Sequence, residues 1–144
     1  MPLARQFFSK AEQELLLKAI AKAEENTSGE IRLHLENFCL GSEIKAAQKV
    51  FNRLGMHKTK ESNGILIYIA TMSRKIAMIG DKGIHEKLGE AFWNSQVQLL
   101  IQEFKKQNQA ESLAKSIEAC GEMLGKYFPH QSDDVNELSN DISF

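Results

Sequence analysis

Three polar side chains stand at the ends of predicted strands and are the residues best suited to chemistry. Glu30 opens a strand predicted over residues 30–36, and Asp81 follows one predicted over residues 74–80. Asn63 precedes a third strand, over residues 64–70. Calcium and magnesium ions bind where several carboxylate and carbonyl oxygens converge on one point. We therefore expect Glu30, Asp81 and Asn63 to form a divalent-cation site for Ca²⁺ or Mg²⁺.

Other residues near these strand ends add to the expectation, and a simpler interpretation competes with it. Glu61 is a further carboxylate nearby, and glycines beside the strand ends would let backbone carbonyls approach an ion. Alternatively, Asp81 is the N-cap of the helix that follows it, and Glu30 is a solvated strand end. Both interpretations stay open from the sequence.

Arg74 is the candidate for binding an anion. It stands at a predicted turn, and an arginine can hold a phosphate or a carboxylate through two parallel hydrogen bonds. The helix predicted to start at Ser42 could add its N-terminal N–H groups to such a site. The alternative is an arginine that simply lies on the surface of a turn.

The sequence lacks the common catalytic patterns. The four histidines have no zinc-site spacing, and the two cysteines, Cys39 and Cys120, form no C-x-x-C pair. No phosphate-binding glycine loop or nucleophile-elbow motif occurs. His85 stands one helical turn after Asp81, where the two could meet or form only a surface pair. The catalytic residues are therefore unknown, and whether the chain is an enzyme stays open.

The predicted elements place these residues at two edges of one sheet. Residues 64–70 are apolar on both faces, which is typical of a central strand covered on both sides. It pairs with residues 74–80 through a tight turn, and with residues 30–36 through a right-handed parallel crossover. Glu30, Asn63 and Asp81 then share one edge, and Arg74 lies at the opposite edge.

Helical patterns surround the strands. Ser9 and Glu12 form a capping box that starts a first helix, and Asn26 or Gly29 takes the left-handed conformation at its end. Strand 30–36 alternates apolar and polar residues, so we expect it to be half-buried, with His34 outward. A helix over residues 42–54 is predicted to pack four apolar residues inward, namely Ile44, Ala47, Val50 and Phe51.

The remaining elements complete an α/β architecture. Three further helices are predicted over residues 84–88, 94–106 and 109–128, and Pro129 ends the last one. The aromatic pair Phe92 and Trp93 is expected in the core. The whole order predicts a three-layer α/β/α sandwich with a small mixed sheet, a central strand over residues 64–70, and helices on both faces.

Composition and charge narrow the class of protein. The 144 residues are 42% apolar and 26% charged, with a formal net charge of −1, which predicts one folded domain over residues 7–129. A near-neutral charge argues against a general nucleic-acid or membrane-surface binder. Neither a signal peptide nor a membrane span is evident, and the few cysteines suit a reducing compartment, so we expect a cytoplasmic protein.

Residues 130–144 form an acidic C-terminal tail. They contain four carboxylates, Asp133, Asp134, Glu137 and Asp141, and no lysine or arginine. A solvated tail is expected at a terminus. Docking of its apolar residues, Leu138, Ile142 and Phe144, is the alternative.

Three stretches together resemble the TPM domain family: residues 27–31 (TSGEI), 63–70 (NGILIYIA) and 74–84 (RKIAMIGDKGI). The resemblance runs from about Phe7 to Ile142 and is to the small free-standing bacterial members. Other members are the thylakoid-lumen, photosystem-repair and acetylcholine-receptor-modulating proteins. It implies an α/β/α sandwich and a concave acidic surface that binds divalent cations, calcium especially. By motif, Glu30 and Asp81 are the site residues carried over first, and Arg74 and Asn63 second.

Three hypotheses about function follow. The first is a divalent-cation-binding TPM domain with a binding, stress or maintenance role. The second, implied by the acid phosphatase activity attributed to some plant relatives, is a metal-dependent phosphatase in which Arg74 holds the phosphate. The third is a protein–protein interaction module that uses the long C-terminal helix and binds an unknown protein partner.

Overall fold

The computed structural model describes residues 3–130 and 141–144. Within them, the helices and strands follow the predicted order, with two short helices added. The elements are α1 (Ala4–Phe7), α2 (Lys10–Glu24), β1 (Glu30–Glu36), α3 (Glu43–Arg53), the 3-10 helix η1 (Met56–Lys58), β2 (Gly64–Ala70), β3 (Lys75–Gly80), α4 (Lys82–Leu88), α5 (Ala91–Phe104) and α6 (Gln109–Tyr127).

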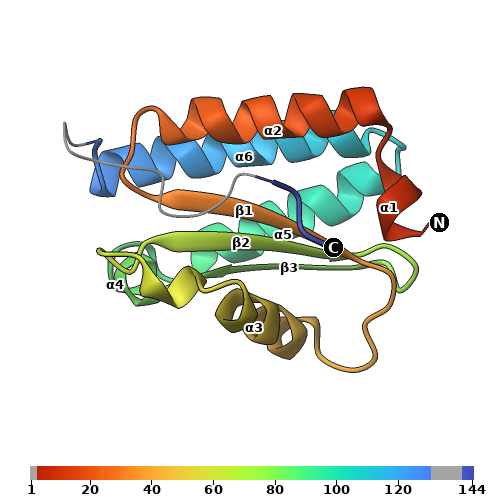
Figure 1. The fold of residues 1–144 in the computed structure, drawn as a ribbon, viewed down its shortest axis with the longest axis horizontal. Helices are drawn as coiled ribbons and strands as arrows, with labels where there is room; N and C mark the ends of the chain where they lie inside the picture. Colours follow the sequence, from red (N-terminus) through yellow and green to blue (C-terminus); the bar gives the residue numbers. More distant parts are fainter. Residues whose placement is uncertain (1–2, 131–140) are drawn as a thin grey trace.

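A mixed sheet of three strands separates two layers of helices (Figure 1). Its order is β1-β2-β3, with β1 parallel to β2 and β3 antiparallel to it. Helices α2 and α6 lie side by side over one face, where α5 also packs, and α3 covers the other face. The predicted α/β/α sandwich with helices on both faces is confirmed.

Strand β2 is the centre of both hydrophobic cores. All seven of its residues are buried, because β1 and β3 flank it and helices cover both of its faces. Ile65, Ile67 and Ile69 join the core under α2, α5 and α6, and Leu66 and Tyr68 join the smaller core under α3. The prediction of a central strand over residues 64–70 is confirmed.

Helix boundaries follow local chemistry, with two corrections. The capping box of Ser9 and Glu12 is present at the start of α2. Neither Asn26 nor Gly29 has a positive φ, so the predicted left-handed end of that helix is wrong. The chain after α2 is instead held by an isolated bridge from Thr27 to Pro129. Ile44, predicted to pack inward, is 46% exposed in the first turn of α3.

Strand β1 is more deeply buried than its alternating pattern predicted. His34, expected to point to solvent, has no exposed surface, because α3's layer covers its face and residues 141–144 lie along the open edge of β1 (Figure 1). The Leu35 N–H donates to the Ser143 carbonyl (2.9 Å), and the Ser143 N–H donates to the Leu33 carbonyl (3.0 Å). The acidic residues Asp133, Asp134 and Glu137, and also Leu138, lie outside the described residues.

Among the helices within residues 3–130 and 141–144, none is both long enough and apolar enough to cross a bilayer.

Candidate functional site

The strand ends that the topology predicted to share one edge do share it. Glu30 is paired with Gly64 across β1 and β2. On the other side, the Asp81 N–H donates to the Gly64 carbonyl (3.0 Å). Glu30, Gly64 and Asp81 therefore form one row across the sheet, and their side-chain positions lie on the face that α3 covers.

Met56 lies over the middle of this row. Its Cε would be 3.5 Å from a Cβ placed on Gly64, and Met56 has no exposed surface. Since neighbouring strands are about 4.8 Å apart, the backbones at Glu30 and Asp81 are about 10 Å apart. The structure thus places the two carboxylates at one edge with an apolar side chain over the position between them.

Glu30 and Asn63 are both buried at this edge. Glu30 is 4% exposed, so the interpretation of a solvated strand end is wrong. Asn63 is 2% exposed, and its Nδ2 donates to the Ser28 Oγ (3.1 Å). The Ser28 hydroxyl donates in turn to the Glu61 carboxylate. Asn63 and Glu61 therefore belong to one hydrogen-bond network around the start of β1.

Asp81 caps α4 and leaves one oxygen unused. Its Oδ1 accepts from the Lys82 N–H (2.8 Å), which confirms the N-cap interpretation. Its Oδ2 is buried and has no hydrogen-bond partner among the described residues. A buried acceptor without a partner costs about 1–3 kcal/mol. This oxygen of Asp81 therefore has a chemical reason to bind an ion or a hydrogen-bond donor.

A cleft of about 630 Å³ adjoins Asp81, between α3, β3, α4 and α5. Its polar lining residues are Gln48, Asn52, His57, Asp81, Lys82, His85, Glu90 and Asn94. Trp93 also lines it; the side chain is 4% exposed, which confirms its place in the core, and its Nε1 has no hydrogen-bond partner within the described part of the chain. The cleft thus brings Asp81 and His85 to one hollow surface.

Arg74 lies away from this cleft, as the topology predicted. It is exposed in the β2–β3 turn at the opposite edge of the sheet, with a positive φ of 55°. The neighbouring Lys75 makes the polar contacts there, because its Nζ donates to the carbonyls of Cys39 (3.1 Å) and Gly41 (2.6 Å). Arg74 and Asp81 are therefore not brought together.

A buried polar network on β1 was missed by the sequence analysis. The His34 ring stacks on Tyr68 with centroids 5.8 Å apart, and its Nε2 lies 3.2 Å from the Glu36 Oε1. The Tyr68 hydroxyl donates to the Glu36 Oε2 (2.6 Å), and the Ser143 Oγ lies 2.8 Å from the His34 Nδ1. The positions of His34 and Glu36, two residues apart on one strand face, could have indicated from the sequence that they interact. The contact with Ser143 could not have been predicted, because that residue lies at the other end of the chain.

The contacts of this network fit a structural role, the anchoring of the C-terminal residues to β1. A Ser–His–Glu chain resembles the pattern of a nucleophile and its base. However, both backbone polar groups of Ser143 are bonded to β1, and His34 has no exposed surface. Because Ser143 is held to β1 by its backbone and by its contact with His34, we assign the network to anchoring residues 141–144.

The network makes folding sensitive to acid. Burial lowers the pKa of His34, and its hydrogen bond to Glu36 offsets only part of that effect. For Glu36, burial opposes ionisation, but hydrogen bonds from Tyr68 and His34 outweigh it and lower its pKa. In both cases the unfolded chain binds more protons than the folded chain, so stability falls as pH falls.

We therefore expect the free energy of unfolding to decrease from pH 7.5 to pH 5.5, with His34 contributing below its unfolded pKa of about 6.5. Urea unfolding at several pH values measures this, and His34→Gln is expected to flatten the pH dependence. His57→Gln, at an exposed histidine, is the matched control and is expected to keep the wild-type dependence. Equal slopes for wild type and His34→Gln would contradict the assignment.

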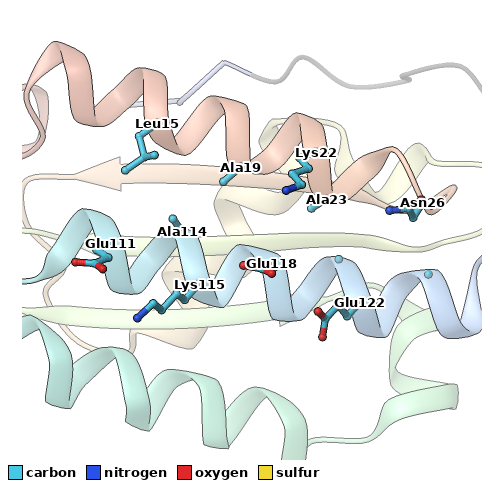
Figure 2. Close-up of a pocket in the computed structure, with 12 residues that line it drawn as sticks. Leu15, Ala19, Lys22, Ala23, Asn26, Glu111, Ala114, Lys115, Glu118 and Glu122 are labelled. Carbon is cyan, nitrogen blue, oxygen red and sulfur yellow. The ribbon is translucent and has the colours of Figure 1, made fainter.

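A second hollow of about 660 Å³ runs between α2 and α6 (Figure 2). Its floor is made of small residues because the helices approach closely: a Cβ on Gly121 would lie 2.6 Å from the Ala23 Cβ. Figure 2 shows Leu15 and Lys22 on the α2 side, and Glu118 and Glu122 on the α6 side. The rim thus carries both signs of charge and one exposed leucine.

Comparisons with solved structures agree with this fold. The NMR structure of BA42 protein from the psychrophilic bacterium Bizionia argentinensis is 39% identical, with a TM-score of 0.89 and 99% of each chain covered. The N-terminal domain of a P. gingivalis protein is 18% identical, with a TM-score of 0.71, over 88% of this chain and 83% of that one. The N-terminal domain of cg2496 from Corynebacterium glutamicum is 14% identical, with a TM-score of 0.64, over 82% and 74%.

A family comparison defines the group to which the chain belongs. None of the curated proteins matches it. The model of the TPM domain matches residues 4–123, which include all three strands, the row from Glu30 to Asp81 and all residues that line the cleft beside Asp81. The matched region covers most of the chain, and the similarity to BA42 extends over nearly all of it. The chain therefore belongs to the TPM domain family.

Proposed function

We propose that this TPM domain binds a divalent cation, Mg²⁺ or Ca²⁺, through Asp81 at the cleft between α3 and α5. The observation that carries the proposal is the buried Asp81 Oδ2, which has no hydrogen-bond partner among residues 3–130 and 141–144. A cation beside it would supply the missing partner. The cellular role we propose is binding, of the stress or maintenance type, rather than turnover of a substrate.

The residues at this edge fit a hydrated ion better than a fully enclosed one. In the described part of the chain, no three His, Cys, Asp or Glu side chains gather closely enough to hold a metal. Calcium sites usually supply six to eight oxygens, whereas Mg²⁺ commonly keeps several waters and uses one or two carboxylates. Asp81 offers one carboxylate beside a cleft of about 630 Å³, which has room for bound waters. We therefore expect a weak site that prefers Mg²⁺.

Removing the Asp81 charge tests the proposal directly. We expect Asp81→Asn to weaken Mg²⁺ binding at least tenfold in isothermal titration calorimetry, because the substitution removes the anionic oxygen that balances the ion. A tenfold loss corresponds to about 1.4 kcal/mol. Glu122→Gln removes one exposed carboxylate on α6, away from the cleft, and is the matched control for net charge.

Two outcomes bear on the proposal. Unchanged affinity in Asp81→Asn would rule out Asp81 as a ligand. Glu30→Gln then separates two versions of the site: we expect its affinity to stay within about twofold of wild type, because Met56 lies over the row between Glu30 and Asp81. A comparable loss in both variants would mean that Glu30 is a ligand as well.

The geometry supports binding over the phosphatase hypothesis. That hypothesis needs a metal at Asp81 and a phosphate at Arg74, yet the two residues lie at opposite edges of the sheet. If the chain released phosphate from a model ester and Asp81→Asn lost that activity, the phosphatase hypothesis would be supported.

Under the interaction-module hypothesis, a protein partner would bind in the hollow between α2 and α6 (Figure 2). A protein partner held there would bind equally well with and without a metal chelator. Binding at Asp81 would not survive the chelator, so this comparison separates the two functions.

A further inference from the structure

We propose that the outer edge of β1 is a strand-binding site, and that residues 141–144 of a second copy of this chain bind it in trans. The inference rests on how the same residues bind this edge within one chain. It does not depend on the cation proposed for Asp81.

The edge of β1 makes backbone bonds that any copy of the segment can make. β2 pairs with one edge of β1, and Ser143 pairs with the other through the Leu35 N–H (2.9 Å) and the Leu33 carbonyl (3.0 Å). Strand addition to a free sheet edge is a general mode of peptide recognition, in which main-chain bonds give affinity and side-chain pockets give specificity. When residues 141–144 leave this edge, it becomes a template for pairing with another chain.

Side-chain contacts make this strand-binding site specific for a segment with an apolar residue, a hydroxyl residue and an aromatic residue in that order. The Ser143 Oγ lies 2.8 Å from the Nδ1 of His34, whose position is fixed by Glu36 on its other nitrogen (3.2 Å). Ile142 packs against the larger core. The Arg5 guanidinium lies 4.7 Å from the centre of the Phe144 ring, within the range of a cation–π contact. A second copy carries the same three side chains and meets the same contacts.

The length of sequence before the segment sets the distance over which exchange could occur. Ten residues, 131–140, separate His130 from Asp141 in the sequence. Ten residues span at most about 35 Å when extended. Exchange of an identical segment between protomers preserves every contact of the closed form and is a low-cost route to a dimer. Within one chain the tether gives the segment an effective concentration of order millimolar, so exchange becomes populated at comparable protein concentrations.

The first test uses a full-length variant in which residues 141–144 pair less well with β1 of their own chain. Ser143→Pro removes the N–H that bonds Leu33 and the hydroxyl that contacts His34, and leaves the β1 edge free. A synthetic peptide of residues 136–144 is titrated into the isotope-labelled variant. We expect saturable shifts of the Leu33, His34 and Leu35 amides at about 0.1–10 mM peptide. A Ser143→Ala peptide is expected to bind about three- to tenfold more weakly, since it lacks one hydrogen bond.

The second test uses the wild-type chain and does not depend on the variant folding. Labelled and unlabelled chains are mixed at millimolar concentration, and isotope-filtered NOEs are recorded. Contacts between Ser143 of one molecule and Leu33 or Leu35 of another would confirm exchange. Absence of intermolecular NOEs, or no amide shifts at β1 up to 10 mM peptide, would overturn the proposal. Neither result involves Asp81, so failure here leaves the cation proposal to its own test.

Discussion

Met56→Ala is expected to lower the free energy of unfolding by about 2–5 kcal/mol, the range for truncating a fully buried methionine. Met56 has no exposed surface, belongs to the core under α3, and lies over Gly64 in the row between Glu30 and Asp81. The alanine variant would leave a cavity at this point. Urea unfolding followed by circular dichroism measures the loss.

The β2–β3 turn provides a matched control for this substitution. Met72 is 38% exposed there, so Met72→Ala is expected to change the unfolding free energy by less than about 0.5 kcal/mol. Similar losses in the two variants would mean that Met56 is not the side chain that fills the space over Gly64. The description of the acidic edge as two separated carboxylates would then be wrong.

Gly83→Ala is expected to cost about 1–3 kcal/mol through overpacking, although alanine has the higher helix propensity. A Cβ at this position would lie 2.5 Å from the Glu61 carbonyl oxygen and 2.7 Å from that of Ser62. Both are backbone atoms, so either the loop or the first turn of α4 must move. The Gly83 N–H bond to Ser62 (2.9 Å) would be strained as well. Because Asp81 caps the same turn, we also expect weaker Mg²⁺ binding.

Gly64→Ala is the matched control for the glycine substitution. Its Cβ would have its nearest contact with the Met56 carbonyl oxygen at 3.4 Å, an ordinary van der Waals distance, and its φ is not positive. We expect a change of less than about 1 kcal/mol, measured by the same unfolding assay. If Gly83→Ala were no more destabilising than Gly64→Ala, the close packing of the 59–63 loop on α4 would be contradicted.

The parts of the fold that local patterns determine could be predicted from the sequence. The unbroken apolar run of residues 64–70 predicted a strand covered on both faces, and the capping box of Ser9 and Glu12 predicted the start of α2. The topology then placed Glu30 and Asp81 at one edge, because a parallel pair followed by an antiparallel hairpin allows only that arrangement. Asp81 as the cap of α4 was predicted as one of two alternatives.

Features that depend on distant parts of the chain could not be predicted in the same way. His34 alternates with apolar neighbours and was assigned to solvent, but Ser143, 109 residues away, covers its ring. No element was predicted between the helix over residues 42–54 and the strand over residues 64–70, yet Met56, which lies there, is fully buried over Gly64. A periodic pattern shows which face of an element is apolar, but it does not show which remote segment covers the other face.

The most direct test of the central proposal, cation binding at Asp81, is a titration of Mg²⁺ into the isotope-labelled chain, followed through backbone amide shifts. We predict saturable shifts centred on Gly80, Asp81, Lys82 and Gly83, smaller shifts at Glu30, and loss of the whole response in Asp81→Asn. Flat shifts at residues 80–83 up to millimolar Mg²⁺, or an unchanged response in Asp81→Asn, would contradict the proposal.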